Sequence, residues 1–126
     1  MTAMKLQKLL FYAQAWSLVW DEKPLFAARI EAWANGPVIP RVYLHHKGCF
    51  KVKPGQFPGN ARALVGRERE TIDAVLKHYG HRTSQWLSDL SHVERPWRDA
   101  RRELQPGERG NAEISLASMA EYYGSL

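Results

Sequence analysis

Residues 2–20 read TAMKLQKLLFYAQAWSLVW and form the first long segment with helical periodicity. Apolar residues recur there at the i, i+3, i+4, i+7 spacing of one helix face, and Ser17 alone interrupts the stripe. Phe11 and Tyr12 widen the apolar surface beyond that stripe. Because a helix that is apolar on most sides is usually central to its domain, we expect a central helix here. It should end before Pro24, since proline disfavours the helical conformation of its predecessor.

Five further segments carry helix patterns or caps. Gly36 and Pro37 indicate a break in regular structure followed by the start of a helix, because glycine tolerates a positive φ and proline fits a first helical turn. We therefore expect a helix over about 37–47. A second clear apolar stripe predicts a helix over 67–79. Three shorter helices are expected after their start signals. These signals are Thr83 or Ser84, then Arg95-Pro96 with apolar positions reaching Leu104, then Ser115.

Two short segments have strand character. Residues 25–33 fit either a short helix or, over 29–33, a short strand. Residues 50–53 alternate apolar and basic side chains and are a candidate partner of 29–33 in a two-stranded ribbon. The remainder of 49–66 is a Pro/Gly-rich loop. The expected fold class is mainly α: one compact single domain, residues 1–126, of five to six helices with at most one small β ribbon.

Composition favours a folded protein of a reducing compartment. The 126 residues are 44% hydrophobic and include five Trp, which argues against disorder. No apolar run approaches the roughly 18 residues needed to cross a bilayer, and no secretory signal pattern is present. Cys49 is the single cysteine, so an intramolecular disulfide is excluded. We expect a cytoplasmic protein with no membrane partner.

Positive charge is concentrated in the first half of the chain. The net charge is +5, and the stretch 41–62 holds basic side chains but no acidic one. Such a patch attracts a polyanion or an acidic protein face, or it is simply a solvated loop. Its basic residues are Arg41, Lys47, Lys51, Lys53 and Arg62.

No motif of a known catalytic or metal chemistry is present in the sequence. Glycine-rich phosphate loops, HExxH and G-x-S-x-G are all missing. His45, His46 and Cys49 lie close together but lack a fourth ligand at a zinc-site spacing, so we expect neither a metal nor a cofactor. Cys49 could serve as a nucleophile, but an unpaired cysteine is more often a small buried hydrophobe. The sequence therefore favours a binding protein over an enzyme, with no catalytic residues.

Aromatic residues divide into core and surface candidates. Four tryptophans, Trp16, Trp20, Trp86 and Trp97, lie on or beside helical stripes and are expected in the core. Trp33 and Tyr43, beside the basic stretch, suit a surface that binds another protein, since aromatic residues are common interface anchors. His92 is either a binding-site histidine or, as we favour, one that ties the 91–96 corner to backbone groups.

Several blocks together resemble the Panacea domain, the SocA-like antitoxin family. They run in order from about residue 5 to 123. The resemblance implies a mostly helical antitoxin of a bacterial or phage toxin–antitoxin pair, which neutralises its cognate protein toxin by direct binding. Some members look like adaptors that deliver the toxin to an ATP-dependent protease. The blocks are KLQKLLFYAQAW (5–16), PLF (24–26), IEAWANGPVIPRVY (30–43), LSDLSHVERPWRDAR (87–101) and a final IS…YY (114–123).

The resemblance and the surface argument supply a candidate partner-binding set. Its members are as easily scaffold as contact surface. Alternative functions remain open: nucleic-acid binding through the basic stretch, which lacks an evident recognition helix, and a small hydrolase that uses Cys49. Assembly into a homo-oligomer is also open. The candidate partner-binding residues are Trp33, Asn35, Gly36, Pro37, Arg41, Tyr43, Lys47, His92 and Trp97.

Overall fold

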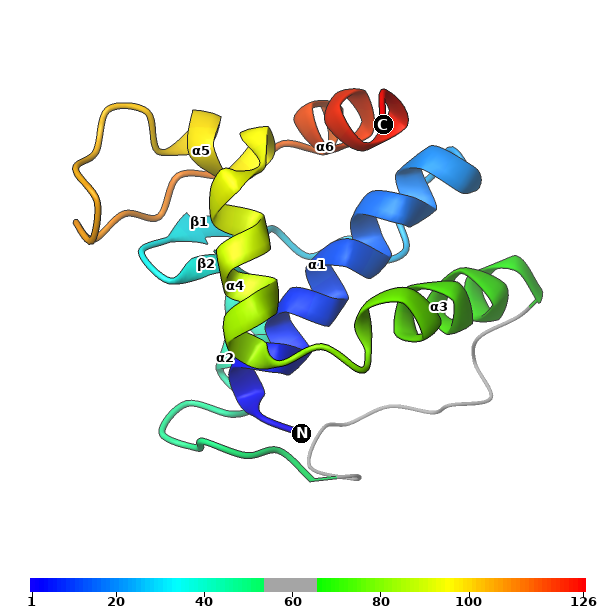
Figure 1. The fold of residues 1–126 in the computed structure, drawn as a ribbon, viewed down its shortest axis with the longest axis horizontal. Helices are drawn as coiled ribbons and strands as arrows, with labels where there is room; N and C mark the ends of the chain where they lie inside the picture. Colours follow the sequence, from blue (N-terminus) through cyan, green and yellow to red (C-terminus); the bar gives the residue numbers. More distant parts are fainter. Residues whose placement is uncertain (54–65) are drawn as a thin grey trace.

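A computed structural model describes residues 1–53 and 66–126 (Figure 1). Within these residues the chain is mainly helical with a small two-stranded antiparallel ribbon, which confirms the expected fold class. Most of the Pro/Gly-rich loop expected at 49–66, including Arg62, lies outside the described residues. The elements are α1 (Ala3–Trp20), β1 (Glu31–Trp33), β2 (Gly36–Val38), α2 (Pro40–Tyr43), α3 (Gly66–Tyr79), α4 (Ser84–Val93), α5 (Arg95–Ala100) and α6 (Leu116–Gly124).

Helix α1 is central, as its apolar pattern predicts. Thr2 caps its N-terminus by accepting a hydrogen bond from the Lys5 N–H at 3.1 Å, and the helix ends before Pro24. Helices α3, α4 and α6 and strand β2 all contact it, and Figure 1 shows it passing between them. Residues on several sides of α1 are therefore buried, including polar ones.

The other helix starts follow their caps, but one helix is shorter than expected. Thr83, not Ser84, caps α4, and Ser115 caps α6. Helix α5 ends at Ala100 although its apolar positions continue to Leu104. Its C-cap residue, Arg101, leaves the helical conformation and donates from a guanidinium nitrogen to the Ala32 carbonyl at 3.0 Å.

The helix expected over 37–47 is wrong at both ends, because residues 36–38 form a strand and residues 44–47 form a turn. Gly36 and Pro37 belong to β2, and α2 begins only at Pro40 and spans four residues. Gly36 has φ +125°, a conformation that side-chain-bearing residues rarely adopt, as it leaves the turn between the strands. Pro37 fits β2 because, among the described strands, β2 pairs with β1 alone, and the other edge of such a strand needs no N–H donor.

The expected pairing of 50–53 with 29–33 is also wrong. Strand β1 pairs with β2, with Glu31 opposite Val38. The other edge of β1 is occupied by the chain before α6, where the Ala32 N–H donates to the Ala112 carbonyl at 2.8 Å. Lys51 instead bridges to Thr2, next to the start of α1.

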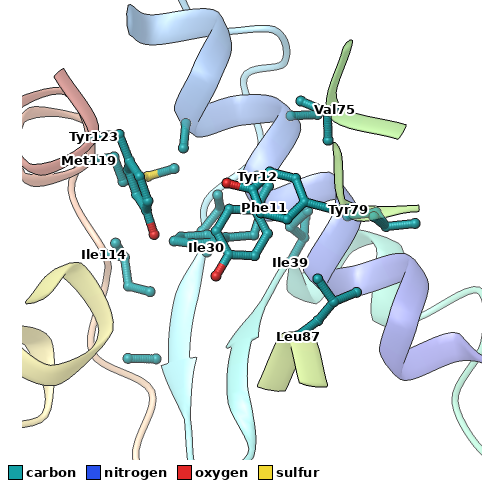
Figure 2. Packing of buried hydrophobic residues seen from close by; sticks show 14 residues of the cluster. Phe11, Tyr12, Ile30, Ile39, Val75, Tyr79, Leu87, Ile114, Met119 and Tyr123 are labelled. Atoms are coloured by element: carbon teal, nitrogen blue, oxygen red, sulfur yellow. The ribbon is translucent and has the colours of Figure 1, made fainter. Parts of the chain in front are cut away.

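The core is rich in aromatic rings. Figure 2 shows Phe11 and Tyr12 of α1 between Tyr123 of α6 and Tyr79 of α3. Tyr12 stacks on Tyr79 with ring centroids 4.3 Å apart and meets Tyr123 edge to face at 6.0 Å. Edge-to-face and offset stacked pairs add specific attraction to the burial of apolar area.

Two of the four tryptophans expected in the core are exposed. Trp16 and Trp97 pack against the core, whereas Trp20 and Trp86 retain 50% and 37% of their surface. Trp20 stacks on Trp16 at the end of α1, and the Arg82 guanidinium lies 4.4 Å from the Trp86 ring. Helical spacing placed these residues beside the buried face but not within it.

A carboxylate lies within the aromatic core. Glu94, between α4 and α5, is buried, and its Oε1 accepts from the hydroxyls of Tyr12 at 2.6 Å and Tyr123 at 2.8 Å. Burial raises the pKa of Glu94, and the two hydroxyl donors partly oppose that rise because they favour the charged form. This bonded group connects three helical segments that are distant in the sequence.

We expect Tyr123→Phe to destabilise the fold in a pH-dependent way. A hydrogen bond to a charged acceptor contributes about 1.5–3 kcal/mol and one to a neutral acceptor about 1 kcal/mol. The lost hydroxyl stabilises the ionised Glu94, so its contribution is present at higher pH and falls as pH drops through the raised pKa of this carboxyl. Urea unfolding at pH 8 and pH 4 measures the difference.

Tyr122→Phe is the matched control, since Tyr122 is the neighbouring residue of α6 and its hydroxyl does not bond Glu94 in the described structure. A loss for Tyr123→Phe that is equal at both pH values, or equal to the loss in the control, would contradict this account.

Candidate functional site

An open pocket of about 930 Å³ lies where four segments distant in the sequence meet. The segments are the start of α1, the β1–β2 turn, the end of α2 with the turn after it, and residues 109–111. Candidate residues Trp33, Asn35, Tyr43 and Lys47 all line this pocket. The structure therefore brings together four of the nine residues that the sequence suggested.

Aromatic side chains form one wall of the pocket. The Trp33 and Tyr43 rings meet edge to face with centroids 5.0 Å apart, and both residues are half-buried. The Trp33 indole N–H donates to Glu31 Oε1 at 2.8 Å, which orients the ring. Tyr43 also meets the His46 ring edge to face at 5.3 Å. These contacts hold large apolar surfaces in place beside open space.

The charged side chains on the pocket are cations. Lys8, Lys47 and Arg109 line it, and among the described residues no Asp or Glu does. Lys8 is 2% exposed, and its Nζ donates to the Pro37 carbonyl at 3.3 Å. Burial lowers the pKa of Lys8 from 10.5 to about 8, because the interior disfavours the charged form.

Gln7 of α1 fixes the position of α2 beside the pocket. Its Oε1 accepts from the Ile39 N–H at 2.8 Å, immediately before α2 begins. Its Nε2 lies 2.8 Å from His46 Nε2, just after α2 ends. One buried amide thus holds both ends of the short helix that carries Tyr43.

Three side chains of α4 and α5 form hydrogen bonds with the turn between β1 and β2. The Trp97 indole N–H donates to the Trp33 carbonyl at 2.9 Å, and the Ser88 hydroxyl donates to the Asn35 carbonyl at 3.0 Å. Between them, His92 Nε2 lies 3.2 Å from the Ala34 carbonyl. Three consecutive backbone carbonyls are therefore bonded by α4 and α5.

His92 has the backbone-bonding geometry that we favoured. Its Nδ1 lies 2.5 Å from the Ser88 carbonyl and its Nε2 lies 3.2 Å from the Ala34 carbonyl, so its ring nitrogens connect the 91–96 corner to backbone groups of α4 and of the β1–β2 turn. The His92 and Trp97 rings are in contact, with centroids 4.0 Å apart. Both residues support the pocket wall from outside the pocket.

The remaining candidates occupy different places. Gly36 and Pro37 are buried in β2, where Gly36 packs against the Lys8 stem. Arg41 is exposed on α2 and is not among the pocket-lining residues. Cys49, expected as a small buried residue, is exposed at the pocket edge, because it follows Gly48 in a surface turn.

Sequence reasoning missed Lys8, Gln7, His46 and Arg109. A lysine in a helix that is apolar on most sides was a usable signal for Lys8, since a charge on such a helix needs a special environment. Arg109 gave no local signal, because only the tertiary fold brings residues 109–111 to the start of α1. No group of three His, Cys, Asp or Glu side chains able to hold a metal occurs within residues 1–53 and 66–126.

A smaller pocket of about 530 Å³ lies between α1 and α3. It is mostly apolar and includes Trp16, Trp20 and Val75, with Lys77 beside them. It is a second concave surface, remote from the β1–β2 turn in the sequence, and it provides a site for control substitutions. In the part of the chain described, no helix combines the length and apolar character needed to cross a membrane.

Comparison with known proteins gives one match. A family model described as antitoxin SocA-like, Panacea domain, matches residues 6–98. No curated protein and no solved structure matches the chain significantly. The matched range includes Lys8, Trp33, Tyr43, His92 and Trp97 and ends before Arg109.

We expect Gly36→Ala to cost about 2–3 kcal/mol of stability. A side chain at φ +125° is strained, and the added Cβ would lie 2.5 Å from Lys8 Cε. Gly48→Ala is the control: its φ is +82° but nothing lies within 4 Å of the new Cβ, so we expect about 1 kcal/mol. Denaturant unfolding measures both, and equal losses would show that contact with Lys8 is unimportant.

The lowered pKa of Lys8 predicts a stability change at alkaline pH. Between about pH 8 and 10.5 the unfolded chain keeps a proton that folded Lys8 has released, so stability rises with pH across this window. The rise is at most about 1.4 kcal/mol per pH unit. Subtracting the unfolding free energy of Lys8→Met from that of the wild type at each pH isolates this rise in stability from the effect of tyrosine titration.

Lys5→Met serves as the control, because Lys5 lies on the same helix but does not line the pocket. If the wild type and Lys8→Met change in parallel from pH 8 to 10.5, the burial of a charged lysine is refuted.

Proposed function

The chain belongs to the SocA-like Panacea antitoxin family, and we propose that it neutralises a cognate protein toxin by direct protein–protein binding. The family match over residues 6–98 is the observation that carries this proposal. In this proposal the antitoxin occludes the toxin and performs no reaction on it. Because toxins and antitoxins act in pairs, we expect the reading frame beside this chain to encode the toxin.

The pocket and its rim are the proposed toxin-binding surface. Trp33 and Tyr43 supply aromatic anchors of the type that dominates binding energy, with Asn35 and Lys47 on the rim. Arg41 extends the basic surface along α2. Gly36, Pro37, His92 and Trp97 act as positioning residues, because they are buried or bonded behind the turn.

The required affinity is compatible with a surface of this kind. Nanomolar binding corresponds to about −12 kcal/mol, and interfaces of about 800 Å² per partner with a few buried anchors reach it. A wall already held by hydrogen bonds loses less conformational entropy on binding. The bonded carbonyls of residues 33–35 therefore support a tight complex.

A protein partner fits the basic surface better than duplex DNA. Arg41 lies on a helix of only four residues, and Lys47 and Lys51 lie outside helices. A recognition helix in a major groove needs several turns with side chains reaching base edges. The described part of the basic stretch contains no such helix.

The first test is co-expression of this chain with the toxin encoded in the adjacent reading frame. We expect growth to recover and a complex to co-purify. Continued growth arrest without a complex would refute the proposal. Toxin half-life then separates two modes: an occluding antitoxin leaves the toxin abundant and inert, whereas a protease adaptor shortens its half-life.

A matched pair of charge reversals tests the location of the surface. Lys47→Glu on the pocket rim should weaken toxin binding about tenfold, because rim charges steer and stabilise association. Lys77→Glu, beside the pocket between α1 and α3, should change binding less than about twofold. Calorimetric titration of the purified toxin measures both, and the opposite ranking would place the toxin on the α1–α3 side.

A further inference from the structure

We propose that the pocket lined by Trp33, Tyr43 and Lys8 binds a carboxylate of an acidic toxin side chain, and that the ammonium of Lys8 pairs with it. This inference rests on the proposed antitoxin function and names the chemistry of its partner. It concerns a charged group inside the pocket and not the exposed basic stretch.

The Lys8 ammonium has more donors than acceptors. An ammonium carries three N–H donors, and within the described residues Lys8 donates to the Pro37 carbonyl alone, at a long 3.3 Å. A buried charge without a counter-charge is costly, and such charges are normally paired. A partner carboxylate entering the pocket would supply both the missing acceptor and the missing negative charge.

The surroundings of Lys8 increase the demand for an anion. The other titratable groups on the pocket come from the α2 region, which supplies Tyr43, His46, Lys47 and Cys49, and from the loop before α6, which supplies Arg109. Within the described part of the lining no carboxylate offsets the cations. An anionic group therefore enters a site whose charged side chains all favour it.

The backbone accommodates the lysine stem in particular. Gly36 lies so close to it that a Cβ there would be 2.5 Å from Lys8 Cε and 3.0 Å from Nζ. A residue with a side chain at position 36 would displace the ammonium. The ribbon thus leaves space for a buried lysine, although an apolar residue would be less costly in a merely structural position.

The walls favour a peptide over a nucleic acid. Trp33, Tyr43 and Met4 line the same pocket as Lys8 and add apolar surface to it, and the pocket of about 930 Å³ is much larger than one carboxylate. An acidic side chain flanked by apolar residues fits such a site. A phosphodiester backbone needs a row of exposed cations, whereas Lys8 is only 2% exposed.

The test measures binding of the adjacent-gene toxin to the full chain by calorimetry. Lys8→Met should bind at least about thirtyfold more weakly, as expected when one partner of a buried charge pair is removed. Lys5→Met should bind within about twofold of the wild type. Thermal melts verify that Lys8→Met is folded.

The pH dependence of binding supplies a second readout. With a Lys8 pKa of about 8, the protonated fraction falls between pH 7 and pH 9, and binding to the wild type should weaken about tenfold. Lys8→Met should lack this component, so subtracting its pH profile removes contributions from other groups of the chain and from the toxin. Replacing toxin Asp and Glu residues one at a time should identify one whose loss matches Lys8→Met and adds nothing to it.

Each outcome decides the inference. If wild type and Lys8→Met bind alike, if their pH profiles are parallel, or if no acidic toxin residue couples to Lys8, the carboxylate site is overturned while the antitoxin function stands. If the wild-type chain forms no complex with the toxin, the proposed function fails and the inference fails with it.

Discussion

Helix α1 is enclosed by other elements, so each polar side chain that it buries needs a partner inside the protein. Gln14 accepts hydrogen bonds from the Leu25 and Phe26 N–H groups, and Ser17 donates to the Lys23 carbonyl at 2.8 Å. These partners are backbone groups of a segment without regular structure. The polar positions that interrupt the apolar helix therefore fix the path of the chain after it, and the rest of the fold depends on that path.

The same constraint builds the pocket. Gln7 holds the short helix α2, while Ser88, His92 and Trp97 bond three consecutive carbonyls of the β1–β2 turn. The β1–β2 turn and the turn after α2 are irregular segments, which are usually mobile, yet here each is tied to a helix by hydrogen bonds. A surface prepared in this way keeps its shape before a partner arrives, and preorganisation lowers the entropic cost of association.

Two buried ionisable side chains on or beside α1 differ in their hydrogen-bond partners. Glu94 receives hydroxyl donors from Tyr12 and Tyr123 and connects helices within the core. Lys8 donates one long hydrogen bond, to the Pro37 carbonyl at 3.3 Å, and lines the pocket. The first arrangement is complete within the fold, because the described structure supplies both donors. The second leaves the ammonium with one long hydrogen bond and with no carboxylate on the described part of the pocket lining, and the proposed partner carboxylate would complete it.

The sequence by itself determined the features that depend on neighbouring residues: the extent of α1, a helix start at Thr83 or Ser84, the cap at Ser115, the mainly helical class and the membership of an antitoxin family. Only the tertiary structure decided that Gly36 and Pro37 form a strand, that β1 pairs on both edges away from residues 50–53, and that Trp20 and Trp86 are exposed. Strand pairing and burial depend on which distant segment arrives at an edge or face, and periodicity carries no such information. For that reason the sequence did not show that Lys8, one polar residue in an apolar helix, packs against Gly36 and lines a pocket.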